Sequence, residues 1–114
     1  MNDEAIYRFL GLGQRAGYML SGSQQLRDGL KNRKGKLLII TEDTSERTRK
    51  ELTAMAERYR IEWRLFGNKD DLGRALGKGV RTAVLITDGG FGRAVRSRLD
   101  AGHLTGEEAA YAKI

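Results

Sequence analysis

The side chains that could do chemistry in this chain are mostly nitrogen donors. The segment from 21 to 36, SGSQQLRDGLKNRKGK, opens like a capped helix, carries two adjacent glutamines and ends in positive charge. Ser21 or Ser23 is the expected cap, and the backbone N–H groups of Gly22, Ser23 and Gln24 would then be free to bind a phosphate. Glutamine amides both donate to and accept from base edges. The helix start therefore has groups suited to a nucleic acid.

The cations of the same segment extend this chemistry. Asp28 is the one acid among five cations: Arg27, Lys31, Arg33, Lys34 and Lys36. A solvated helix face is the ordinary explanation of such a run. A helix that combined this run with the glutamines would supply both phosphate-positioning and base-reading groups.

Enzymatic chemistry is poorly supported by the residues present. The chain has no cysteine and a single histidine, His103, which excludes disulfides, thiol catalysis and a histidine-rich metal site. The serines have only this one histidine to share as a base, and it lies in the polar tail. We expect no enzyme, no cofactor and no structural metal.

Three carboxylates, Glu42, Asp43 and Asp88, follow predicted strands, where α/β proteins place ligands and paired acids bind divalent ions. Asp43 and Asp88 each also precede a predicted helix, so capping explains them without a metal, and we favour capping.

The glycine-rich segment from Gly11 to Gly17, GLGQRAG, superficially resembles a phosphate loop. It follows a predicted helix instead of a strand, and its spacing differs from the dinucleotide fingerprint. Close helix packing and a helix stop explain these glycines better.

The elements that position these residues alternate in type. Apolar spacing predicts helices over 4–16 and 21–33, and a third helix that starts between Asp43 and Glu46 and ends near Arg60. A short fourth helix is predicted to be capped by Asn68 and Asp71 and to end at Gly77 and Gly79. A fifth helix is predicted after residue 90. Strands are predicted over 36–41, 61–66 and 82–87, the first of them central and buried on both faces. The pattern predicts an α/β sandwich, with helices on both faces of a sheet of about four strands.

The length, charge and composition of the chain restrict the class of partner and the cellular compartment. With 114 residues the chain is predicted to form one domain over 1–100, followed by a polar tail over 101–114 that has a capping-box pattern for a short helix. The formal charge of +6 favours a polyanionic partner. An acidic start and the lack of a long apolar stretch predict a cytoplasmic protein without a membrane partner.

Four ordered motifs carry a family resemblance over residues 5 to about 97: LGLGQRAGYMLSG, KGKLLIITEDTSERTRKEL, FGNKDDLGRALGK and VLITDGGFGRAV. In their order and spacing the chain resembles the ribosomal protein L-seven-Ae family and, within it, the small bacterial YlxQ-type members. The resemblance implies a three-layer α/β/α sandwich. For many members it also implies binding of kinked or internally looped RNA through the start of the second helix and nearby loops.

The chain departs from the family at the start of this helix. RNA-binding members have Gly, a small residue, Asn and Glu there, and a Lys three residues after the Glu. Gly22 and Ser23 agree, but Gln24 and Gln25 replace Asn and Glu, and Asp28 replaces Lys. Gln25 lacks the charge that best accepts two guanine donors, and Asp28 would repel phosphate, so RNA binding is better supported than kink-turn specificity.

A second predicted contact is the loop 87–92, TDGGFG. Its glycines allow close approach of RNA and Phe91 could stack on a base, although burial of Phe91 in a tight turn is the stronger explanation. Arg93, Arg96 and Arg98 extend this footprint toward the basic run.

We therefore expect a non-enzymatic, monomeric RNA-binding protein for structured, kink-turn-like or ribosomal RNA, with protein partners left open. The alternative is a protein-interaction module on the same fold. The predicted RNA-binding residues are Gly22, Ser23, Gln24, Gln25, Arg27, Lys31, Arg33, Lys34, Gly89, Gly90, Phe91 and Arg93.

Overall fold

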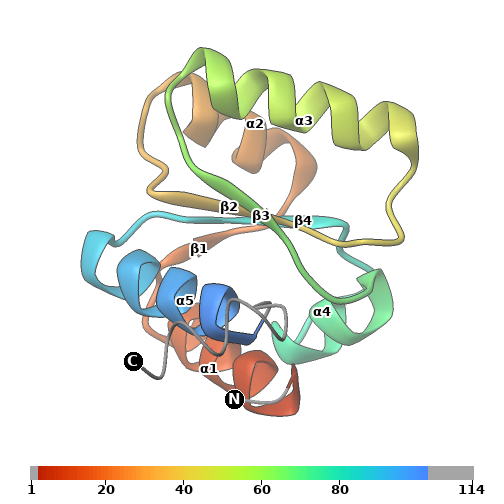
Figure 1. Ribbon diagram of the computed structural model, residues 1–114, viewed down its shortest axis with the longest axis vertical. Helices are drawn as coiled ribbons and strands as arrows, with labels where there is room; N and C mark the ends of the chain where they lie inside the picture. Colours follow the sequence, from red (N-terminus) through yellow and green to blue (C-terminus); the bar gives the residue numbers. More distant parts are fainter. Residues whose placement is uncertain (1–2, 103–114) are drawn as a thin grey trace, which may run out of the picture.

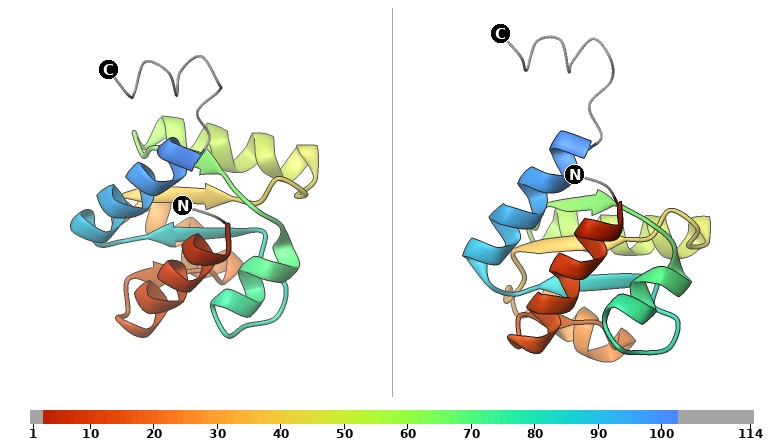
Figure 2. Two further views of the ribbon diagram at one scale, coloured as in Figure 1. Left: turned by 60° about the horizontal axis from the view of Figure 1, so that its bottom comes forward. Right: turned by 90° about the horizontal axis from the view of Figure 1, so that it is seen from below.

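The computed structural model describes residues 3–102, which form the three-layer α/β/α sandwich that was predicted (Figure 1). The elements in chain order are α1 (Asp3–Arg15), β1 (Met19–Leu20), α2 (Ser23–Lys31), β2 (Leu37–Ile40), α3 (Glu46–Arg58), β3 (Trp63–Leu65), α4 (Lys69–Ala75), β4 (Ala83–Ile86) and α5 (Gly89–Gly102). Helices α2 and α3 cover one face of the sheet. Helices α1, α4 and α5 cover the other, as the views in Figure 2 show.

The sheet is mixed and has the strand order β1-β4-β2-β3. Strands β2 and β3 are parallel, whereas β4 runs antiparallel to both of its neighbours, β1 and β2. Every residue of β2 and β4 is buried, which confirms the prediction of a central, doubly covered strand over 36–41. Strand β1 was not predicted, because two residues are too few to show a period.

Alternation along the central strands produces a core on each side of the sheet. Leu37 and Ile39 pack with the layer of α1, α4 and α5, whereas Leu38 and Ile40 pack with α2 and α3. Buried residues that recur at helical spacing on all five helices complete both cores.

The glycine-rich segment has the structural role favoured from the sequence. Gly11 is buried where α1 meets α4, and a Cβ there would lie 2.9 Å from the carbonyl oxygen of Ala75. A Cβ on Gly13 would collide with the ring of Phe91. Gly17, with φ of +82°, follows the end of α1.

The predicted cap of the third helix needed correction. The cap of α3 is Ser45, which accepts from the Thr48 N–H at 3.1 Å, so Asp43 does not cap this helix. Asp43 instead accepts from the backbone N–H of Lys69 at 3.0 Å and so serves the first turn of α4, whose cap is Asn68 as predicted. Capping is therefore the role of Asp43, but at a helix distant in the sequence.

Helix α5 runs to Gly102, two residues past the predicted domain boundary. The predicted tail helix lies outside the described residues. None of the helices in residues 3–102 combines the length and apolarity that crossing a bilayer requires.

Candidate nucleic-acid interface

Helix α2 begins without a side-chain cap. Gly22 is the N-cap residue, with extended backbone angles, and neither Ser21 nor Ser23 makes the predicted capping hydrogen bond. Ser23 instead lies within 3.5 Å of the Nε of Arg27, one turn further along the helix. The first backbone N–H groups of α2 therefore face outward without a capping side chain, where the helix dipole favours an anion.

The two glutamines of this turn are exposed and differently placed. Gln24 donates from Nε2 to the carboxylate of Asp28 at 2.9 Å, which leaves its own carbonyl oxygen as an acceptor. Gln25 folds back over the helix start, since a Cβ on Gly22 would lie 3.5 Å from its Oε1. Both amides thus surround the open end of the helix.

Arg27 extends from α2 toward α3 beside this end of the helix and lines the hollow described below. It forms an ion pair with Glu51 of α3, and its guanidinium also lies 3.8 Å from the sulfur of Met55. The structure therefore places Arg27 at the contact between α2 and α3, next to the start of α2, and its role in RNA binding stays a prediction.

A hollow of about 470 Å³ lies beside the start of α2, between this helix, α3 and the loop that joins α4 to β4. The loop contributes Val80, whose exposed fraction is 54%, and Arg81, which donates from Nε to the hydroxyl of Ser21 at 3.2 Å. The hollow thus combines an open helix start, a cation and an exposed apolar side chain.

Sequence reasoning missed this loop, which lies sixty residues from the helix start along the chain. It becomes a neighbour of Ser21 because β4 pairs with β1, so that the residues before β4 meet the residues after β1. One local signal was available: Val80 is an apolar residue in the glycine-containing stretch GKGVR, outside any helical or strand period.

The loop 87–92 lies at the other end of α2. Ile86 is paired with Leu37 at the beginning of β2, so the loop that follows β4 is next to the end of α2 and far from its start. Asp88 caps α5 by accepting from the Phe91 N–H at 2.8 Å, as favoured from the sequence. Gly89 and Gly90 lie beneath the guanidinium of Arg93.

Phe91 is packed into the molecule. Its ring lies 4.7 Å from that of Phe9 and 5.7 Å from that of Tyr18, on top of Gly13. This arrangement favours the burial alternative over stacking on a base.

The predicted binding residues therefore divide into two groups. Gly22, Ser23, Gln24 and Gln25 surround the start of α2. Lys31, Arg33 and Lys34 belong to its end, on the side of Gly89, Gly90 and Arg93. Nine helical residues at 1.5 Å each separate the groups by about 14 Å.

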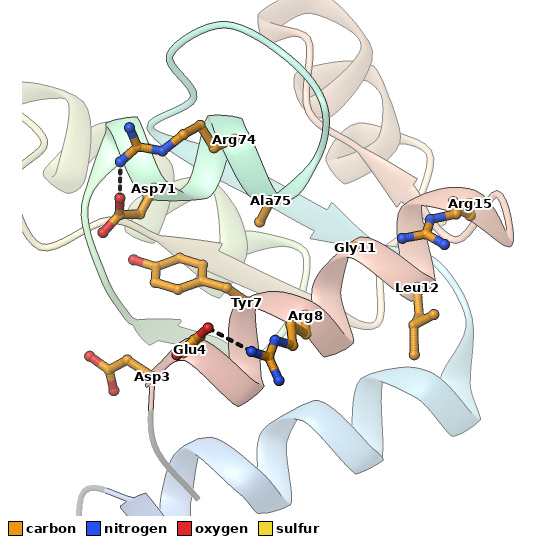
Figure 3. A pocket seen from close by; sticks show the side chains of 10 residues that line it. All are labelled: Asp3, Glu4, Tyr7, Arg8, Gly11, Leu12, Arg15, Asp71, Arg74 and Ala75. Carbon is orange, nitrogen blue, oxygen red and sulfur yellow. Dashed lines mark hydrogen bonds and ion pairs between the residues drawn. The ribbon is translucent and has the colours of Figure 1, made fainter.

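A larger cleft of about 820 Å³ between α1 and α4 lies in the opposite layer (Figure 3). Tyr7 extends from α1 toward α4, and its hydroxyl accepts from the Asn68 N–H at 3.1 Å. Burial raises the pKa of Tyr7, and the nearby charge of Asp71 adds to this effect. Arg74 pairs with Asp71, and its hydrogen bond lowers the pKa of that carboxyl. Three acids and three arginines line the cleft, and two ion pairs, Glu4–Arg8 and Asp71–Arg74, form among them, so the cleft offers a polyanion little net positive charge.

Comparisons with known proteins identify the family of this chain. The family model described as ribosomal protein L7Ae/L30e/S12e/Gadd45 family matches residues 4–94. The RNA-binding protein YlxQ of Bacillus subtilis (strain 168) is 34% identical over 94 residues, 82% of this chain and 94% of the relative. RNA-binding protein YlxQ of Enterococcus faecium is 23% identical, over 87% of this chain and 95% of its own length.

Two solved structures share the fold. A protein of unknown function from Bacillus halodurans has a TM-score of 0.79 and 33% identity, over 83% of this chain and 96% of the other. The 15.5kD RNA binding protein of Giardia lamblia has a TM-score of 0.70 and 18% identity, over 89% and 92% of the two chains. The second similarity concerns the fold alone.

Proposed function

The chain belongs to the ribosomal protein L7Ae/L30e/S12e/Gadd45 family, and from that premise we propose that it binds structured RNA through the start of α2 and the α4–β4 loop. The two YlxQ relatives are named RNA-binding proteins, the family is described as one of ribosomal proteins, and the chain is non-enzymatic, as expected from the sequence. The RNA we propose contains an internal loop or kink, at which unpaired bases are accessible.

The observation that carries the proposal is the pairing of an uncapped helix start with Arg81. Backbone N–H groups at a helix start bind phosphate oxygens, and the guanidinium of Arg81 next to them adds a full positive charge. The exposed side chain of Val80 gives an apolar surface against which an unstacked base can lie.

Base reading falls to Gln24 under this proposal. The RNA-binding pattern of the resemblance has Asn, Glu and Lys where this chain has Gln24, Gln25 and Asp28. Since Gln24 donates to Asp28, its free carbonyl oxygen is directed to a base donor, such as the amino group of guanine or adenine. We propose that the chain selects looped RNA by this acceptor and lacks the charged guanine contacts of kink-turn readers.

A mobility-shift assay at low salt tests the function. It compares a kink-turn RNA, a structured RNA with an internal loop but no kink, and a plain duplex. We expect both looped RNAs to bind more tightly than the duplex, with less preference for the kink-turn than the Asn-Glu-Lys pattern would give.

The alternative is a protein-interaction module. It is favoured by the exposed carboxylate of Asp28, which opposes phosphate near the helix start. Failure of all three RNAs to bind would decide for this alternative.

A further inference from the structure

Cations from distant parts of the sequence meet at the end of α2, opposite the proposed binding site. We call this surface the basic edge and define it by Arg33, Lys34, Lys36, Arg60 and Arg93. All five side chains are exposed, and none of them forms an ion pair with another residue of the range 3–102. The edge therefore carries five exposed cations whose charge no described acid neutralises through an ion pair.

The sheet topology explains why these residues lie together. The parallel strands β2 and β3 both begin at this edge, directly after the ends of α2 and α3, and the antiparallel strand β4 ends there, directly before α5 (Figure 1). The Lys36 N–H donates to the Ile86 carbonyl at 2.6 Å. A Cβ on Gly92 would lie 3.4 Å from the Cβ of Lys36, which brings the segment of Arg93 against that of Lys36.

Both helices of this layer end in the same strained way. After α2, Arg33 N–H donates to the Leu30 carbonyl and Lys34 N–H to the Gly29 carbonyl, at 3.1 and 3.0 Å, the hydrogen bonds of a Schellman motif. The residue at the left-handed position of this motif is normally glycine, because a Cβ is unfavourable there. Here it is Arg33, with φ of +56°.

Helix α3 repeats the motif with a second arginine. Arg60 N–H donates to the Glu57 carbonyl and Ile61 N–H to the Ala56 carbonyl, at 3.1 and 2.8 Å, and φ of Arg60 is +58°. Arginine thus occupies the glycine position at both helix ends, on one edge, where nothing in the motif itself requires its side chain.

The acids near the edge are largely occupied. Glu62 pairs with Arg64 and Arg96, and Asp88 caps α5. Glu57, one turn before Arg60, is exposed and has no ion pair within residues 3–102. The balance on the edge is therefore strongly positive.

We propose that the basic edge is a second RNA-contacting surface, which binds phosphates irrespective of base sequence. The inference rests on the proposed function, because it places the edge about 14 Å from the base-reading site, along the nine residues of α2. A helical stem that flanks the recognised loop would extend over this distance. Arginine forks match phosphate geometry, whereas the exposed large apolar residues that a protein interface would use, Leu12, Tyr18 and Val80, are not members of the edge.

Arg33→Gly and Arg60→Gly test the surface, because they remove the charge and the backbone strain together. Each variant should reduce the slope of log affinity against log salt by about one unit. This reduction should be equal for an internal-loop hairpin and a plain duplex, with an unchanged preference between them. The midpoint of thermal unfolding should equal or exceed that of the unaltered protein. Lys50→Ala, which removes one exposed charge from α3 outside the edge, should keep the original salt slope.

The outcomes separate this surface from the proposed function. Lys34→Ala involves no strained backbone and should also reduce the slope for both RNAs. An unchanged slope in all three edge variants, with binding intact, would refute the surface and leave the function standing. A lower unfolding midpoint together with weaker binding in the glycine variants would show that the arginines are structural, and would likewise refute it. Absence of RNA binding by the unaltered protein would refute the function itself.

Discussion

The side-chain amide of Gln24 donates to the carboxylate of Asp28 at 2.9 Å, across one turn at the start of α2. Two of the three residues that depart from the family pattern are thus linked to each other. The hydrogen bond fixes the orientation of an exposed amide, and it also holds a negative charge close to the place where RNA phosphate is proposed to bind. From this hydrogen bond we predict that the protein recognises a donor group on an RNA base but binds the RNA backbone less tightly at this turn.

Replacement of Asp28 by lysine should tighten RNA binding by about thirtyfold, because an unfavourable charge interaction of about 1 kcal/mol becomes a favourable one of similar size. Fluorescence anisotropy with a labelled internal-loop hairpin measures the affinity. Asp28→Asn, which only removes the charge, should give an intermediate value. Weaker binding by the lysine variant would mean that phosphate does not approach this turn.

Loss of the Gln24 amide should affect the discrimination between looped and duplex RNA more than the overall affinity for RNA. Gln24→Ala is expected to reduce the preference for looped RNA over duplex by about fivefold, corresponding to about 1 kcal/mol for one lost base contact. Lys34→Ala should weaken the binding of both RNAs equally, because it removes a phosphate contact only. Competition binding with both RNAs gives the ratio, and equal losses in the two variants would remove the base-reading role of Gln24.

The α4–β4 loop provides a matched pair of cations. Arg81→Ala should weaken RNA binding several-fold, because Arg81 lies in the hollow beside Ser21. Lys78→Ala removes an exposed charge from the same loop, outside that hollow, and should have a clearly smaller effect. Circular dichroism controls for folding. Equal affinities of the two variants would argue that the loop acts only through its net charge.

Gly67→Ala should lower the free energy of unfolding by at least about 1 kcal/mol. The residue has φ of +68°, and a Cβ there would collide with the Tyr7 hydroxyl. Gly79→Ala serves as the control, since a Cβ at Gly79 meets nothing within 4 Å. Urea denaturation measures both variants, and equal stabilities would contradict the packing of Tyr7 against this turn.

The layers and most elements could be predicted because they depend on local patterns. The buried strand Leu37–Ile40 and the Asn68 cap can be predicted from neighbouring residues alone. The glycines of α1 were also interpreted correctly, although their partners, Phe91 and the Ala75 carbonyl, became visible only in three dimensions.

The site was predicted less completely, because it depends on strand order. Nothing local indicates that β4 lies between β1 and β2, and this order brings Arg81 to Ser21 and moves Gly89 to the far end of α2. Arg27 was assigned from its charge, whereas its ion pair with Glu51 follows from the packing of two helices. The serine caps were expected from residue type, but α2 begins at Gly22 without them.

Titration of the isotopically labelled protein with an internal-loop hairpin, followed through amide resonances, tests the proposed site most directly. The account predicts the largest shift changes at Gly22, Ser23, Gln24 and Gln25 and at Val80, Arg81 and Thr82, with smaller changes at the basic edge. Changes confined to the basic edge, or an absence of changes around the start of α2, would contradict it.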